Sequence, residues 1–160
     1  MQTMTNPILP TDAAARDLAL RLIREGVSAS LATLDPSGHP FASLIAVAGD
    51  DDARIFSLMS ALSAHTKHLA ADPRCALLIA PGGKGDPLAH PRLSLKCQAR
   101  WIARESDEGQ RARERLLHGN PGAKIYIDFL DFRLVVFDIQ AASLNAGFGK
   151  AYELSRNDLF

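Results

Sequence analysis

The stretch VSASLATLDPSGHPFASLIAVAGDDDARIFSLM, residues 27–59, contains three strand-like runs that are separated only by short turns. The first run, 27–34, is small and β-branched, and DPSG at 35–38 places Pro36 at the second position of a type I turn. GDDD at 49–52 separates the second run from the third. Consecutive parallel strands need a crossover of a dozen or more residues, for which this stretch has no room. We therefore predict an antiparallel meander and not a doubly wound parallel sheet.

The rest of the chain adds helices and further strands to this meander. Apolar residues at helical spacing, with Gly or Pro after them, predict helices, and alternating apolar runs predict strands. The expected helices cover residues 13–25, 60–72 and 105–119, with a shorter one from Pro121, and the expected strands cover 74–80, 92–103 and part or all of 133–149. We expect a single domain over residues 1–160, with a flexible tail over 1–10. Its class is α+β, mostly β: an antiparallel barrel with peripheral helices.

The charges of the chain balance, since 18 Lys and Arg residues are matched by 18 Asp and Glu residues. No overall field would hold a nucleic acid or an anionic membrane, so any anion site has to be local. No apolar run approaches the ~18 residues of a membrane-spanning helix, and the first ten residues do not resemble a signal peptide. Cys75 and Cys97 lie in strand-like runs and do not make a disulfide framework. We expect a cytoplasmic protein.

Several familiar site patterns are absent. GGKG at 82–85 is not followed by the Lys-Ser/Thr of a nucleotide-binding loop, and no GxSxG elbow occurs. Among the histidines only His65 and His68 form a close pair, and no carboxylate stands at an established metal-ligand spacing beside them. The sequence therefore predicts no metal site and no hydrolase, and no residue stands out as a catalytic acid, base or nucleophile.

One junction between a strand and a helix has the composition of an anion site. Ser60 and Ser63 lie before or in the first turn of the expected helix, and His65, Thr66 and Lys67 follow within about a turn. Backbone N–H groups, hydroxyls and an ammonium group could therefore converge on a phosphate. The alternative is that a serine merely caps the helix while the lysine lies in solvent. The residues alone favour that alternative, because serine before a helix is common.

A second stretch, NAGFGKA at residues 145–151, has glycines on both sides of an aromatic residue. Gly147 and Gly149 flank Phe148, and Lys150 follows. Glycines here permit the backbone to approach a ligand or another subunit closely. They are equally compatible with a bulge or a bend of a barrel strand.

Four blocks of the sequence together resemble a known family. They are SLATLDPSGHPFASLIAVA, SLMSALSAHTKHLAADPRCALLIA, GDPLAHPRLSLKCQARWI and IDFLDFRLVVFDIQAASLNAGFGKAYEL, which span residues 30–154 in consistent order. These blocks resemble the pyridoxamine 5′-phosphate oxidase-like FMN-binding split barrels, in the branch that includes haem-utilisation proteins of the HugZ type. The resemblance implies a six- or seven-stranded split barrel that forms a homodimer, with one FMN in each of two clefts between the subunits.

The resemblance also assigns residues by position. It implies that a flavin phosphate and ribityl chain are held by Ser60, Ser63, His65, Thr66 and Lys67, and that the isoalloxazine is lined by Ala42, Ser43 and Leu44. Met59, Gly147, Gly149 and Lys150 complete the expected cofactor-binding set. The implied function is that of an FMN-binding flavoprotein and oxidoreductase with an unknown small-molecule substrate. The alternative is a haem-binding or haem-utilisation protein that uses the same dimer cleft.

Overall fold

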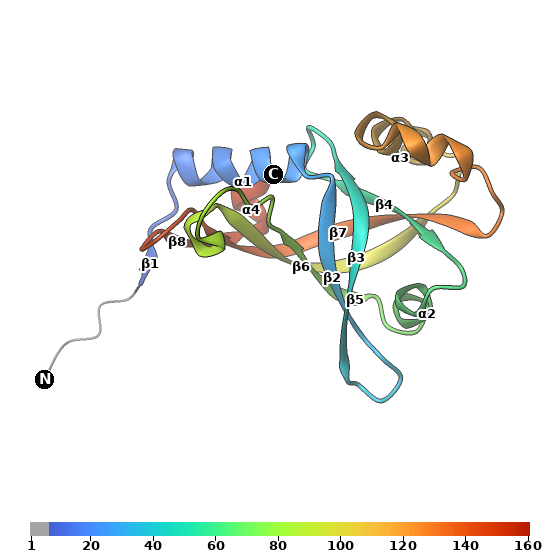
Figure 1. Cartoon of the computed structure of the whole chain (residues 1–160), viewed down its shortest axis with the longest axis horizontal. Coiled ribbons are helices and arrows are strands. Elements are labelled where there is room, and N and C mark those ends of the chain that lie inside the picture. Colours follow the sequence, from blue (N-terminus) through green and yellow to red (C-terminus); the bar gives the residue numbers. More distant parts are fainter. Residues whose placement is uncertain (1–6) are drawn as a thin grey trace, which may run out of the picture.

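The computed structural model describes residues 7–160. The strands of this part form one sheet that closes into a barrel (Figure 1). The hydrogen-bonded strand order is β1-β8-β7-β4-β3-β2-β5-β6, and β6 also pairs with β7. Six strands, β2 to β7, therefore close an antiparallel barrel, and β8 and β1 extend it beside β7. The strands are β1 (Ile8–Leu9), β2 (Ser28–Leu34), β3 (Pro40–Gly49), β4 (Ile55–Ser60), β5 (Arg74–Ile79), β6 (Arg92–Ile102), β7 (Phe132–Asn145) and β8 (Ala151–Ser155). The predicted split barrel is confirmed.

The helices lie around the ends of this barrel (Figure 1). They are α1 (Ala13–Glu25), α2 (Ala64–Ala71), α3 (Asp107–Gly119) and α4 (Arg156–Leu159), with the 3₁₀ turns η1 (Pro87–Ala89) and η2 (Pro121–Ile125). α1 and α3 lie along the same side of the barrel, whereas α2 lies toward the opposite side. None of the helices in residues 7–160 combines the length and the apolar character that crossing a membrane requires.

The predicted meander is present with its short turns. β2 pairs antiparallel with β3 from Ser28↔Ala46 to Leu34↔Pro40, and β3 pairs with β4. The carboxylate of Asp35 accepts backbone hydrogen bonds from Ser37 and His39 and so stabilises the first turn. Local turn chemistry therefore determines the strand pairing here.

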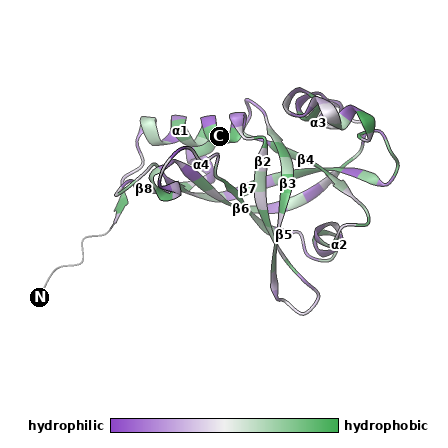
Figure 2. Cartoon of the chain, in the orientation of Figure 1, coloured by the Kyte–Doolittle hydropathy of each residue, from purple (hydrophilic) through white to green (hydrophobic). Residues whose placement is uncertain are grey.

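The predicted first helix is confirmed as α1. Asp12 caps it, because its carboxylate accepts the N–H of Ala15 at 2.8 Å, and Gly26 follows its last residue. The buried side of α1 carries Ala15, Ala19, Leu22 and Ile23. In Figure 2 green and purple segments alternate along α1, as expected of a helix with one apolar side against the barrel.

Alternation along the strands fills the barrel. In β2 every second residue is buried, and β6 follows the same pattern over Leu93, Leu95 and Cys97. Phe56 and Phe137 are the largest side chains that are almost fully buried among the described residues. Because successive side chains of a strand point to opposite faces, the other half of these residues faces outward.

Two helix predictions were wrong in extent. The helix expected over 60–72 begins only at Ala64, because Ser60 still pairs with Phe132 in the sheet and the N–H of Ala61 donates to the carbonyl of Asp131. The helix expected from Pro121 is the short 3₁₀ turn η2.

The segment after η2 is held by a few turn hydrogen bonds, such as that from the N–H of Ile127 to the carbonyl of Ala123, and by a side chain. The guanidinium of Arg104 donates to the carbonyls of Ile127, Phe129 and Phe132. The bonds from Arg104 add to these turn hydrogen bonds and satisfy carbonyls where no continuous helical ladder does so.

The two ends of the chain differ from the expectation as well. Of the tail predicted over 1–10, residues 1–6 lie outside the described part, and Ile8 and Leu9 pair in parallel with Ala151 and Tyr152 of β8. At the other end, α4 was not predicted. It begins with a capping box, in which the Asp158 carboxylate accepts from both the N–H and the hydroxyl of Ser155.

Candidate functional site

The N-terminus of α2 offers backbone donors that the helix itself does not use. Its first intrahelical bond runs from the N–H of Lys67 to the carbonyl of Ser63, so the N–H groups of Ala64, His65 and Thr66 precede that bond. The hydroxyl of Ser63, the residue before the helix, makes no capping hydrogen bond. The first turn of α2 is therefore free to receive an acceptor from outside the helix.

One predicted pair of site residues is brought together beside this turn. Ser43 Oγ of β3 lies 3.1 Å from His65 Nδ1 of α2, within hydrogen-bonding distance. Burial, and to a smaller extent the charge of His68, lowers the pKa of His65 below its ordinary value of 6.5. His65 is therefore mainly neutral at pH 7, and the fixed positive charge of the site comes from Lys67, which is exposed and has no ion pair within residues 7–160.

A second histidine pair was missed by the sequence analysis. Thr33 Oγ1 of β2 lies 2.8 Å from His68 Nδ1, and the ring of Phe41 meets the His68 ring edge-on, with centroids 5.2 Å apart. The available signal was the i, i+3 spacing of His65 and His68, which places both rings on one side of a helix. Together the two pairs attach α2 to the end of the barrel and leave each Nε2 without a hydrogen bond to the described residues.

Three other predicted residues are occupied with internal contacts. Thr66 is 3% exposed, and its hydroxyl donates to the carbonyl of Ser60 at 2.6 Å. The hydroxyl of Ser60 accepts the N–H of Leu62 at 3.2 Å. Met59 is 1% exposed and packs in the barrel core. These contacts support the turn that leads into α2, and the assignment of the three residues to a cofactor stays a prediction.

Strand alternation separates the predicted residues of β3. Ser43 points toward α2, whereas Ala42 and Leu44 lie on the outer face of the barrel, where Leu44 is 77% exposed. On that face the neighbouring strands also carry small or apolar residues. The cross-strand register aligns Leu44 with Ser30 and Leu78, and Ala42 with Ala32 and Ala76. This set of residues is called the small-residue face below.

The glycine-containing turn lies far from α2 within one chain. Gly147 and Gly149 adopt φ values of 122° and 71°, which favour glycine, in the turn between β7 and β8. The N–H of Lys150 donates to the carbonyl of Gly147 and closes the turn. In Figure 1 β8 lies toward the left end of the molecule, whereas α2 lies in its right half. A single chain therefore does not bring this turn to α2.

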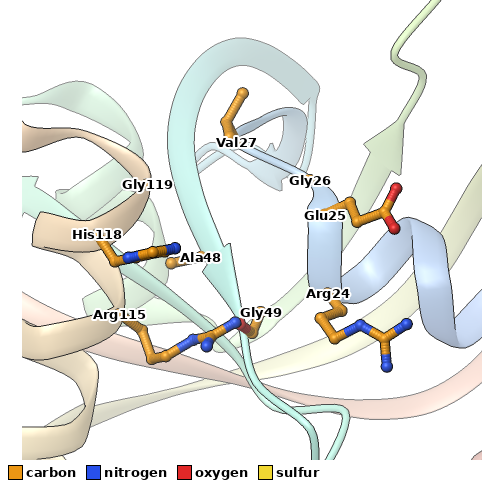
Figure 3. Close-up of a pocket in the computed structure, with 9 residues that line it drawn as sticks. All are labelled: Arg24, Glu25, Gly26, Val27, Ala48, Gly49, Arg115, His118 and Gly119. Carbon is orange, nitrogen blue, oxygen red and sulfur yellow. The ribbon is translucent and has the colours of Figure 1, made fainter.

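A separate cleft of about 440 Å³ opens between the C-terminal ends of α1 and α3 (Figure 3). Arg24, Val27, Gly49, Arg115 and His118 are among the residues that line it, and none of the predicted site residues does. No group of three or more His, Cys, Asp or Glu side chains in residues 7–160 is placed to hold a metal ion.

Comparisons with known proteins agree with this fold. The sequence model of the family described as pyridoxamine 5′-phosphate oxidase matches residues 16–145. The chain is 28% identical over 115 residues to the chloroplastic heme oxygenase HOZ of Arabidopsis thaliana, which covers 72% of this chain and 34% of that protein.

Solved structures show the same similarity. The heme binding protein of Mycobacterium smegmatis superposes with a TM-score of 0.81 and 29% identity, over 95% of this chain and 61% of that one. ChuZ of Campylobacter jejuni superposes with a TM-score of 0.79 and 19% identity, over 94% of this chain and 63% of that one, which is a similarity of fold. The chain thus spans about a third of the curated relative and less than two thirds of these two structures.

Proposed function

The chain belongs to the pyridoxamine 5′-phosphate oxidase family, and from this premise we propose that it is an FMN-binding flavoprotein, an oxidoreductase that acts on a small molecule. The observation that carries the proposal is the uncapped first turn of α2 beside the Ser43–His65 pair. FMN has one strongly anionic group, its phosphate, and the residues at this turn fit such a group.

The fit rests on donors and charge. The free N–H groups of Ala64, His65 and Thr66 point out of the N-terminus of α2, where the helix dipole favours an anion. The uncommitted hydroxyl of Ser63 and the ammonium group of Lys67 add a donor and a full charge. Neutral His65 adds a hydrogen-bonding ring without a second charge. When bound, the flavin would supply the redox chemistry, and these residues would bind and orient it.

We also propose that the active form is a homodimer with the cofactor between its subunits. The small-residue face supports this, because Leu44 and Leu78 are exposed on it at 77% and 37% and flat faces of small side chains permit close packing. The turn at Gly147–Lys150 supports the homodimer too. This turn lies far from α2 in its own chain, so it can contribute to a cleft at α2 only from a second copy. With both cysteines free, the cytoplasm is the proposed compartment.

The proposal is tested with the double variant Ser63→Ala, Lys67→Ala. It should weaken FMN binding at least tenfold, about 1.4 kcal/mol, when binding is followed by quenching of flavin fluorescence. Riboflavin lacks the phosphate, so its affinity should not change.

Lys84→Ala is the matched control, because Lys84 is an exposed lysine in the loop between β5 and β6. It should bind FMN like the unmodified protein. An unchanged FMN affinity in the double variant would remove the proposed phosphate site.

Haem is the second candidate ligand, and two observations favour it. Relatives with 28% and 29% identity are named as a heme oxygenase and a heme binding protein. In addition, Nδ1 of His65 and Nδ1 of His68 each lie within hydrogen-bonding distance of a hydroxyl, which leaves Nε2 available. Histidines that bind a metal commonly use one ring nitrogen as the ligand while the other makes such a hydrogen bond.

An absorption spectrum distinguishes the two candidates. Flavin bands in the purified protein support FMN. A Soret band that forms after hemin is added, and that shifts in His65→Ala or His68→Ala, supports haem. A protein that shows neither chromophore after incubation with both compounds would contradict both.

A further inference from the structure

The cleft between α1 and α3 is built by a close contact that involves Gly49, the last residue of β3. A Cβ atom on Gly49 would lie 2.0 Å from the carbonyl oxygen of Ile23, so the end of α1 rests directly on the backbone of β3. From the other side, Arg115 of α3 donates through Nε and Nη2 to the carbonyl oxygen of Gly49, at 2.9 and 2.5 Å. The two helices are thereby held apart at a defined separation, and the cleft of about 440 Å³ lies between their ends.

The wall formed by α3 carries positive charge. Arg115 and His118 are three residues apart, on one side of α3, and Figure 3 shows both side chains extending toward Ala48 and Gly49. The Gly49 carbonyl occupies two nitrogens of the Arg115 guanidinium, and Nη1 has no partner within the described residues.

The wall formed by α1 adds a second arginine and little opposing charge. Arg24 lines the cleft, and its ion pair with Asp51 is long, at 4.0 Å, with both side chains substantially exposed, so it competes weakly for the guanidinium. Glu25 is the only carboxylate among the lining residues, and in Figure 3 the Glu25 carboxylate and the Arg24 guanidinium both extend away from Arg115 and His118. Among the lining side chains two arginines accompany one carboxylate, an excess of one positive charge in a chain that has no net charge. This excess offsets the partial negative charge of the two helix C-terminal ends that meet at the cleft.

An apolar hollow continues from the charged cleft. Val27 is 58% exposed and lines both the cleft and a neighbouring cavity of about 190 Å³. The walls of that cavity include the apolar Leu22, Ile79 and Pro81, and Glu25 and Ser28 also line it. A ligand at this position would meet guanidinium and imidazole groups at one end and aliphatic side chains at the other. This combination of a few polar groups with an apolar lining is typical of small-molecule sites, and the cleft volume lies in their range of about 300–1,000 Å³.

We propose that this cleft binds a small organic anion, a carboxylate carried on a short aliphatic body. Arg115 Nη1 and His118 contact the carboxylate, and Val27 with the adjoining hollow contacts the aliphatic part. The site lies on the other side of the barrel from α2 and is independent of the proposed flavin.

The proposal is tested by titrating the full chain with sodium hexanoate and following backbone amide signals by NMR. Saturable shifts are expected at Val27, Ala48 and Gly119. The variant His118→Ala should weaken binding at least about tenfold. Arg115 is left in place because it also holds α3 to β3.

Two further measurements keep the outcome decisive. Val27→Asp, which adds a negative charge at an exposed position of the cleft, should also weaken hexanoate binding, whereas the exposed Lys124→Ala, outside the cleft, should leave it unchanged. Inorganic phosphate should bind more weakly than hexanoate because it has no aliphatic part. Absence of saturable shifts, equal affinity in His118→Ala, or tighter binding of phosphate would overturn the proposal.

Discussion

Substituting Gly49 by alanine tests the contact on which the arrangement of α1, β3 and α3 depends. The added Cβ would lie 2.0 Å from Ile23 O and 2.6 Å from Ile23 C, both backbone atoms that cannot rotate away. Either α1 or the end of β3 has to move, which breaks packing of buried residues or the hydrogen bonds from Arg115 to Gly49 O. Overpacking of this kind costs about 1–3 kcal/mol, and a clash with rigid backbone belongs at the upper end, about 3 kcal/mol.

The expected loss is large enough to measure directly. In a domain of this size each kcal/mol shifts Tm by about 2–4 °C, so Gly49→Ala should lower Tm by about 6–12 °C in a thermal melt followed by circular dichroism. In urea, the free energy of unfolding should rank the variants in the same order. The slope of that free energy against urea concentration should be unchanged. The variant should also lose hexanoate binding in the cleft, because the two helix ends no longer keep their separation.

Gly119→Ala is the matched control for this experiment. It adds the same methyl group on the rim of the same cleft, and no atom lies within 4 Å of the new Cβ. Its stability should stay within about 1 kcal/mol of the unmodified protein, since alanine is the better helix former. A Gly49→Ala protein that is as stable as Gly119→Ala would refute the contact between α1 and β3.

Two further predictions concern titratable groups. The pKa of His65 is lowered in the folded protein, so the unfolded chain binds more protons just below pH 6.5, and stability should fall as the pH drops through this value. His65→Gln should flatten the dependence on pH, between about 5 and 7, of the free energy of unfolding measured in urea. If this pH dependence stayed the same in the variant, another group would be its cause. Burial raises the pKa of Cys75 to about 12 and raises that of Cys97 as well, so both thiols stay protonated at neutral pH. An aromatic disulfide reagent should therefore modify them much more slowly in the folded protein than in urea, and equal rates would contradict their burial.

Much of the fold was predictable because its signals are local. The turn that begins at Asp35, the helix over residues 13–25 that ends before Gly26 and the alternation along β6 each depend on neighbours within a few residues, and each was confirmed. The start of α2 was wrong because it depends on a distant strand: Ser60 continues β4 by pairing with Phe132. Helical periodicity alone contains no information about such a partner.

The candidate site divides in the same way. The composition of residues 60–67 indicated a possible anion site, and the structure adds that the first turn of α2 is uncapped and lies beside Ser43. Alternation in β3 places Ala42 and Leu44 on the face opposite to Ser43, a separation that the family resemblance did not indicate. The Thr33–His68 pair joins residues 35 positions apart, and no short-range pattern links them.

The sequence by itself determined that the chain forms an antiparallel, mostly β barrel, because periodicity, turn residues and caps act over short distances and agree with one another. Only the tertiary structure decided which helix end is free to bind an anion, which histidines have hydroxyl partners, and that Arg24, Arg115 and His118 surround one cleft. These features depend on where barrel closure places segments that are far apart along the chain. Their geometry follows from the packing of the whole molecule, which the local residue pattern does not encode.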